Sequence, residues 1–398
     1  MDCFGCCPKE LQAEAEKVAT NEAQNAVSNA TRAAPNMQNT MGAGGGNSAL
    51  SQALNAVGGM QGLMGMVQSL ASGQTPSLPS TSNATDFKQK AAQALPAEVH
   101  MFSGCRDEQT SADVYDTSSF GLPADSGPGG AGGACTNSIM LALSENPNPT
   151  WIDLLNRMRT ILKEKGFTQV PQLSSSKEIS LDGNFQLAAA SSSTKALLIG
   201  INYVGQKGEL RGCHNDVLQM KDYILKNGYD PASMRVLMDD GSNMNPTRAN
   251  ILDSIKWLVK DAKSGDCLFM HYSGHGGSMK DDNGDEADGM DETMVPVDYT
   301  STGQIRDDII FQELVAPLPQ GVKLTVIMDC CHSGTILDLP FSFTANDQNT
   351  QNYTSGMTLP MNGNFNWKKI FDIGMSMLKK YGMGGAMGGA QSGMSANV

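Results

Sequence analysis

A histidine and a cysteine each follow an apolar run of the sequence, and together they could carry out acyl transfer. His275 lies in the segment HYSGHGG, and Cys331 lies in DCCHSG, 56 residues further along the chain. A neutral thiol is a weak nucleophile, so it needs a nearby imidazole to generate the thiolate. The small residues around His275 would let backbone N–H groups approach an oxyanion. A lone histidine or cysteine is more often structural, whereas this pair at two strand ends indicates nucleophilic catalysis.

The two apolar runs that precede these residues predict buried strands at 267–273 and 322–329, of the kind found in parallel sheets. Further strands are expected at 195–202 and 235–238, and a helix at 213–227. A second helix follows, with Asn245 as its N-cap and Pro246 at its first position. The alternation predicts an α/β fold whose mostly parallel central sheet is flanked by helices. Such sheets bind ligands beyond the carboxyl ends of their strands, where His275 and Cys331 lie.

The N-terminal part of the folded region reads as a smaller unit. It contains an expected strand at 99–103, a helix capped by Thr150 with an apolar stripe, and an edge strand at 170–174. A Ser- and Ala-rich stretch that includes Lys177 then predicts a flexible, exposed linker. In the larger unit, a Gly- and Asp-rich loop is expected at 274–304 and a short helix near 306–316.

Composition sets the boundaries of these parts. No charged residue occurs from Ala33 to Thr85, and this stretch is too poor in branched and aromatic side chains to form a core. We therefore expect five parts: a disordered N-terminal region (1–94), a smaller unit (95–175), a linker (176–194), a larger catalytic region (195–345) and a C-terminal tail (346–398).

The charge and the termini bear on partners and location. A formal net charge of −13 without a basic stripe argues against a nucleic-acid partner. It is compatible with basic substrates, with divalent cations, or with solubility alone. No secretory signal or transmembrane segment is visible, so we expect reduced thiols and a cytoplasmic protein, with a monomer favoured. Acylation of Cys3, Cys6 and Cys7, or a basic amphipathic helix at 365–382, leaves peripheral membrane association open.

Several motifs together resemble the metacaspases, which are caspase-like cysteine peptidases. Residues 195–338 resemble the large-subunit region through GINY, GCHNDV, HYSGHGG, PVD and DCCHSGT. The N-terminal unit resembles the small subunit through FSGCRDEQTSADV and GGACTNS. A small-subunit segment that precedes the large one marks the type III arrangement. The resemblance implies a caspase-like fold that the N-terminal small-subunit-like unit completes.

The resemblance also implies roles for individual residues. His275 would be the base, Cys331 the nucleophile, and the backbone N–H groups of Gly276 and Cys331 the oxyanion donors. Cys330 departs from the commoner DSCH motif and places a second thiol beside the nucleophile. The family's specificity pocket maps onto Cys213, Asp216, Ser273 and Asp329. Its two carboxylates would favour protein or peptide substrates with Arg or Lys at the cleaved position, although Asp216 could instead cap its own helix.

An acidic loop at 281–292 nearly fits an EF-hand, but Glu286 stands where glycine is required. Many metacaspases need calcium, and the family's ligand positions map onto Asp291, Asp307, Asp308 and Asp338; acidic residues kept for solubility are the alternative. Calcium held near Asp338 could order the loop that carries the nucleophile.

The resemblance thus implies a calcium-activated cysteine endopeptidase that cleaves after Arg or Lys without an organic cofactor. A catalytically silent calcium-binding or scaffold protein would keep the fold but not need His275 and Cys331. A peptidase specific for Asp or Asn would need a basic pocket. Self-cleavage at Lys177 or Lys195 is an open alternative for maturation.

Overall fold

The computed structural model describes residues 84–104, 113–114, 132–188, 192–280, 290–330, 333–362 and 365. The chain divides into two units, residues 1–94 with 370–398, and residues 95–369. Helix α4 (Ala84–Ala94) is the described part of the first unit, and every other described element belongs to the second. Within these described residues, no helix combines the length and apolar character needed to cross a membrane.

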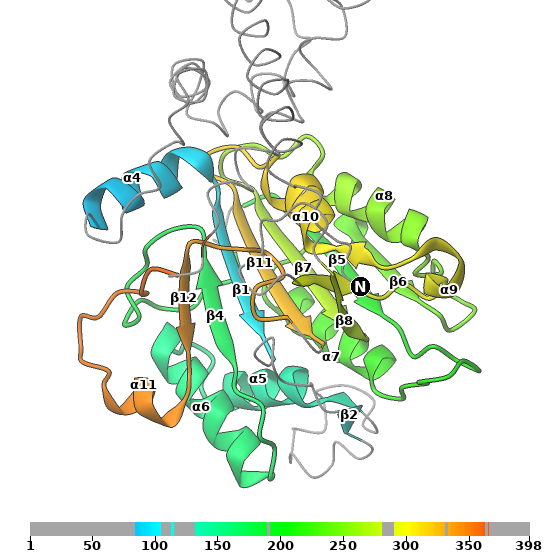
Figure 1. Cartoon of the computed structure of the whole chain (residues 1–398), viewed down its shortest axis with the longest axis horizontal. Coiled ribbons are helices and arrows are strands. Elements are labelled where there is room, and N and C mark those ends of the chain that lie inside the picture. The colour runs from blue at the N-terminus through cyan, green and yellow to red at the C-terminus, as the bar shows by residue number, and fades with distance from the viewer. Residues whose placement is uncertain are drawn as a thin grey trace, which may run out of the picture. The chain divides into compact units, whose positions relative to one another are not determined.

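A seven-stranded sheet forms the centre of the second unit (Figure 1). Its strands lie in the order β12 (Phe341–Thr344), β4 (Gln172–Ser175), β1 (Glu98–Ser103), β11 (Lys323–Asp329), β7 (Cys267–Ser273), β5 (Thr194–Gly200) and β6 (Met234–Met238). The five strands from β1 to β6 pair in parallel, whereas β4 runs antiparallel to both of its neighbours, β1 and β12. The predicted α/β fold with a mostly parallel sheet is therefore confirmed.

Helices cover this sheet, which is why its central strands are apolar throughout. Every residue of β7 is buried, so neither face of that strand contacts solvent. Helix α7 (Cys213–Lys226) packs on β5 and β7, α5 (Ala134–Glu145) packs on β11, α6 (Trp151–Glu164) and α7, and α8 (Arg248–Val259) packs on β5. Helix α6 begins where expected, because the Thr150 side chain accepts a hydrogen bond from the Asp153 N–H.

A second, three-stranded antiparallel sheet follows β7 directly. It consists of β8 (Gly276–Lys280), β9 (Met290–Met294) and β10 (Ile305–Arg306), with β9 in the middle. The remaining elements are short: β2 (Asp113–Val114), β3 (Gly132–Gly133), α9 (Tyr299–Thr302), α10 (Asp307–Ile310), α11 (Asp347–Gln351), a 3-10 turn (Pro231–Ser233) and a π-helical turn (Phe311–Val315). The helix expected near 306–316 is therefore present, as α10 and the π-helical turn.

The strand register brings the two predicted catalytic segments to one edge of the large sheet. Asp329, the last residue of β11, pairs with Ser273, the last residue of β7. Ser273 pairs in turn with Gly200 at the end of β5. Because β1, β11, β7 and β5 pair in parallel, their carboxyl ends share one edge of the sheet (Figure 1).

Two predicted boundaries of the N-terminal part are wrong. The disordered region was expected to reach residue 94, but residues 84–94 form α4, in which Phe87, Ala91 and Ala94 share one apolar face. The stretch predicted as a flexible linker is ordered from residue 176 to 188, because Leu181, Phe185 and Leu187 are buried. The Phe185 ring lies 5.3 Å from that of Trp151, and the Trp151 N–H donates to the Gly183 carbonyl at 2.9 Å. Residues 189–191 lie outside the described residues.

Three smaller expectations also need correction. Strand β4 is not an edge strand, because β12 pairs with it on the side away from β1. The buried side chains of Phe341 and Phe343 hold β12 in this place. The cap of α8 is Thr247, whose side chain accepts from the Asn250 N–H. The loop expected at 274–304 contains β8, β9 and α9, since the pairing of β8 with β9 satisfies its backbone.

The tail predicted from residue 346 is ordered as far as residue 362. There α11 begins at an Asn346 cap, and the Leu359 N–H donates to the Ile179 carbonyl at 2.8 Å. The basic amphipathic helix expected at 365–382 lies outside the described residues, except for Phe365. The cysteines at positions 3, 6 and 7 also lie outside them.

Candidate active site

His275 lies just beyond the carboxyl end of β7, two residues after Ser273. The Gly274 N–H donates to the carbonyl of Asp329 at 3.4 Å, which ties the chain after β7 to the end of β11. Cys331 lies outside the described residues. Its neighbour Cys330 is buried, and the Ser333 hydroxyl donates to the Cys330 carbonyl at 3.0 Å.

The imidazole of His275 is held by the loop that follows β5. Its Nε2 lies 2.6 Å from the carbonyl oxygen of Gly208. A carbonyl can only accept a hydrogen bond, so Nε2 carries the proton and, in the neutral ring, Nδ1 is the basic atom. Gly208 has a φ of +88°, and a Cβ there would lie 3.3 Å from Nε2, so both the backbone conformation and the space favour glycine. The ring of Tyr203 also packs against the imidazole, and the two ring centroids are 4.7 Å apart.

Three of the four residues predicted for a specificity pocket, Asp216, Ser273 and Asp329, lie at the same edge of the large sheet. The Ser273 hydroxyl donates to the Asp216 carboxylate at 2.7 Å. The Gly133 N–H also reaches both Asp216 oxygens, at 2.9 and 2.8 Å. Asp329 accepts from the Thr136 N–H at 2.7 Å. Asp216 and Asp329 are 0% and 4% exposed, so two carboxylates are buried around the start of α5.

Gly133 is the point at which these two acids meet. A Cβ at this position would lie 2.1 Å from Asp329 Oδ2, so only glycine lets the backbone approach both carboxylates. The start of α5 supplies N–H groups and the positive end of a helix dipole to them. The Asp216 carboxylate accepts hydrogen bonds from β7 and from the N–H just before α5, so it joins α7 to both of these elements.

Cys213, the fourth pocket residue, is buried at the first position of α7. Its N–H donates to the Asn202 side chain at 3.0 Å, which connects this helix start to the loop after β5. Gly276, predicted as an oxyanion donor, is half-buried and begins β8 opposite Met294.

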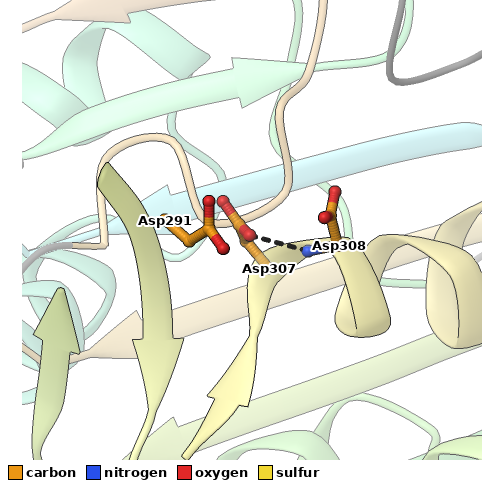
Figure 2. Close-up of side chains that lie close together, drawn as sticks. All are labelled: Asp291, Asp307 and Asp308. Carbon is orange, nitrogen blue, oxygen red and sulfur yellow. Dashed lines mark hydrogen bonds between the residues drawn. The ribbon is translucent and has the colours of Figure 1, made fainter. Parts of the chain in front are cut away.

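A second acidic group lies on the small sheet. Carboxylate oxygens of Asp291, Asp307 and Asp308 lie within 4.8 Å of one another, and Figure 2 shows those of Asp291 and Asp307 side by side. Asp291 is on β9, and the other two residues open α10, where the Asp308 N–H donates to Asp307 Oδ1 at 2.7 Å. The guanidinium of Arg306 forms an ion pair with Asp291. Within the described part of the chain, Asp338 does not join this group.

Hard oxygen donors gathered from two elements fit a calcium ion, which takes six to eight such ligands. Asp291 and Asp307 are 1% and 0% exposed, so their carboxyl groups are buried close together. Arg306 supplies one positive charge to this group. A divalent cation would supply two.

Sequence reasoning assigned no role to several residues that contact the site. Tyr203 lies in the GINY motif, and Gly133 and Thr136 lie in GGACTNS, so both segments were noticed for their resemblance alone. Gly208 lies outside every motif that the sequence analysis used. The glycine itself is a weak signal, because only the folded loop places its carbonyl on His275.

Comparisons with known proteins agree with this architecture. Residues 194–340 match the family described as "Metacaspase, peptidase C14 domain", and residues 6–180 match "Caspase domain". The chain is 47% identical over 294 residues to Metacaspase III c of Phaeodactylum tricornutum, a match that covers 71% of this chain and 85% of that protein.

Two further relatives match over a shorter region. Metacaspase-1 of Mycosarcoma maydis is 51% identical over 162 residues, or 40% of each protein. Metacaspase-1 of Emericella nidulans is 53% identical over 164 residues, or 40% of this chain and 41% of that protein. A solved structure, protein GSU0716 from Geobacter sulfurreducens, is 32% identical over 37% of this chain and 53% of its own, with a TM-score of 0.29. On the strength of the long match to Metacaspase III c, the chain belongs to the metacaspase family of cysteine peptidases.

Proposed function

We propose that this metacaspase is a calcium-activated endopeptidase that cleaves after Arg or Lys, with Cys331 as the nucleophile and His275 as the base. The observation that carries the proposal is the paired ends of β7 and β11. Ser273 and Asp329 are partners in the sheet, His275 follows the first by two residues, and Cys331 follows the second by two. One pair of strand ends thus provides two of the four proposed pocket residues and leads into both proposed catalytic segments.

The proposed reaction uses the Nδ1 atom of His275. In acylation, the Cys331 thiolate forms a bond to the carbonyl carbon, the C–N bond breaks, and the departing amine takes a proton from the imidazolium. In deacylation, neutral His275 takes a proton from water, and the resulting hydroxide displaces the thiolate. The hydrogen bond from Nε2 to Gly208 supports this role, because it leaves the lone pair on Nδ1. The N–H groups of Gly276 and Cys331 are the proposed donors to the oxyanion.

The buried acids support the proposed preference for basic side chains. Hydrogen bonds from Ser273 and Gly133 fix the orientation of Asp216, and one from Thr136 fixes that of Asp329. Burying two carboxylates is costly unless a cation accompanies them. A guanidinium can satisfy two carboxylates through several directed hydrogen bonds, whereas an ammonium offers a single charge centre. We therefore expect Arg to be preferred over Lys, and acidic substrates to be rejected.

The acidic group on the small sheet supports the calcium requirement. Asp291, Asp307 and Asp308 would hold the ion, which would neutralise their mutual repulsion. Asp291 pairs with Met279 of β8, and β8 begins directly after His275. Binding at this group would therefore stabilise the sheet that continues from the catalytic histidine. Asp338 is a weaker candidate, since it does not lie with the other three.

The test is hydrolysis of fluorogenic peptides by purified protein across a calcium titration. Wild type should cleave arginyl and lysyl peptides only with calcium and should leave an aspartyl peptide intact. Cys331→Ala and His275→Ala should abolish turnover, and Cys330→Ala, the matched control, should retain it. Activity that survives Cys331→Ala but not Cys330→Ala would move the nucleophile by one position. A wild-type protein inactive on every peptide at every calcium concentration would overturn the proposal and favour a silent calcium-binding protein.

A further inference from the structure

The backbone of His275 lies between two buried tyrosine hydroxyls. The His275 N–H donates to the hydroxyl of Tyr203 at 2.9 Å. The His275 carbonyl accepts from the hydroxyl of Tyr272 at 2.7 Å. The two hydroxyl oxygens are 3.4 Å apart, and the side chains are 1% and 0% exposed. The peptide groups on both sides of the catalytic histidine are therefore held by the same pair of hydroxyls.

The two hydroxyl protons are used in a defined way. Each hydroxyl has one proton to donate and can accept as well. Tyr203 donates to the Val295 carbonyl at 2.7 Å and accepts from His275. Tyr272 donates to the His275 carbonyl and accepts from the Val295 N–H at 3.3 Å. Burial raises the pKa of both tyrosines, so both hydroxyls keep these protons at neutral pH.

The same hydroxyls connect His275 to the strand that carries Asp291. Val295 directly follows β9, and its N–H also donates to the His275 carbonyl at 3.2 Å. Beyond this point β8 and β9 continue as an antiparallel pair from Gly276 and Met294. His275 thus directly precedes the β8–β9 pair, whose second strand carries Asp291 of the acidic group.

Tyr203 itself is held in an unusual backbone conformation. Its φ is +53°, in the left-handed region that residues other than glycine rarely adopt. The carboxylate of Asp239 accepts from the N–H groups on both sides of it, Asn202 at 2.8 Å and Val204 at 3.1 Å. His214 reaches the same carboxylate at 2.7 Å. A strained residue whose two flanking N–H groups donate to one carboxylate is a typical feature of a site that must keep its geometry.

We propose that the hydroxyls of Tyr203 and Tyr272 are positioning groups that orient the imidazole of His275 by fixing its backbone from both sides. The inference rests on the proposed function, in which His275 is the base. Loss of the Tyr203 hydroxyl leaves the His275 N–H and the Val295 carbonyl without this partner, while the ring that packs on the imidazole remains. Small displacements of a catalytic group affect the chemical step much more than substrate binding.

The test compares Tyr203→Phe and Tyr272→Phe with Tyr229→Phe. Tyr229 is a matched control because it is 3% exposed, its hydroxyl donates to the Leu187 carbonyl at 3.5 Å, and its ring contacts Phe269, four residues before Ser273 on β7. We expect kcat on an arginyl peptide to fall about tenfold in the two test variants with KM within about twofold, and neither to change in the control. Equal kcat values in all three variants, or a rise in KM without a fall in kcat, would overturn the inference.

A second measurement does not depend on activity. In protein with isotopically labelled histidine, the ring signal of His275 is assigned by its loss in His275→Gln. It should move in Tyr203→Phe and Tyr272→Phe and stay in place in Tyr229→Phe. An unmoved signal in the test variants refutes the positioning role even if the peptidase assay fails. A moved signal with an inactive wild type supports that role and refutes the proposed function alone.

Discussion

Two buried histidines predict that this protein loses stability in mild acid. His100 on β1 is 1% exposed and His271 on β7 is 0% exposed. Burial lowers the pKa of each to about 3, aided for His100 by the charge of Lys323. His271 also lies 3.2 Å from the hydroxyl of Thr136, whose N–H binds Asp329, so its protonation would disturb the start of α5. Acid should therefore weaken both the sheet and the pocket.

The size of the effect follows from the two protonation equilibria. The unfolded chain binds a proton at each histidine near pH 6.5, whereas the folded chain does so only near pH 3. Stability from these groups is thus fully present above pH 6.5 and is lost as the pH falls from 6.5 toward 3. At pH 5.5 each histidine lies one unit below its unfolded pKa, which costs about 1.4 kcal/mol, or about 2.8 kcal/mol for both.

The assay is urea unfolding followed by circular dichroism at pH 7.5 and pH 5.5. Other groups also titrate, so the decisive quantity is the difference between wild type and His100→Gln/His271→Gln. The double variant should be less stable at pH 7.5 but should lose about 2.8 kcal/mol less than wild type on acidification. Each single variant should show about half of this difference. An identical loss of stability in wild type and variants would refute the reasoning.

Further predictions concern the pocket, the loop after β5 and the acidic group. Asp329→Asn keeps an acceptor but removes one pocket charge, so kcat/KM for an arginyl peptide should fall about 100-fold; an unchanged value would exclude it from the pocket. Asp239→Asn should relax Tyr203 and lower kcat about fivefold at constant KM, and steady-state kinetics of the double variant with Tyr203→Phe should show less than the product of the two effects. If Asp291 is a calcium ligand, Arg306→Gln should tighten calcium binding about fivefold by calorimetry, since it removes the competing cation; weaker binding would contradict this.

The parts of the fold that could be predicted from sequence are those fixed by local pattern. Residues 267–273 were predicted as a buried strand and form β7, because a strand buried on both faces must be apolar throughout. Thr150 was predicted as a cap and accepts the expected hydrogen bond, because capping involves residues only three apart. The π-helical turn after α10 has no such local signal.

The site could be predicted only in part, because its geometry depends on contacts between distant segments. His275 carries its signal in the glycines around it, but its partner Gly208 is 67 residues away and acts through a backbone carbonyl that any residue possesses. The left-handed φ of Tyr203 has no signal at all, since sequence patterns associate that conformation with glycine. Gly133 could be noticed as a glycine, but its approach to Asp329 exists only in the folded chain.

The segment predicted as a linker shows how composition misleads when a few apolar residues carry the packing. Serine and alanine dominate it, yet buried Leu181 and Phe185 pack it against the start of α6. The strands of the two predicted units also lie in one continuous sheet. Self-cleavage at Lys177 or Lys195 loses its rationale for the same reason. Lys177 is half-buried with its ammonium on the Leu95 carbonyl at 2.6 Å, and Lys195 lies within β5. A peptidase needs an extended, accessible substrate. Cleavage at Lys195 would therefore first require β5 to leave the sheet, and cleavage at Lys177 would require the packed segment 176–188 to unfold locally.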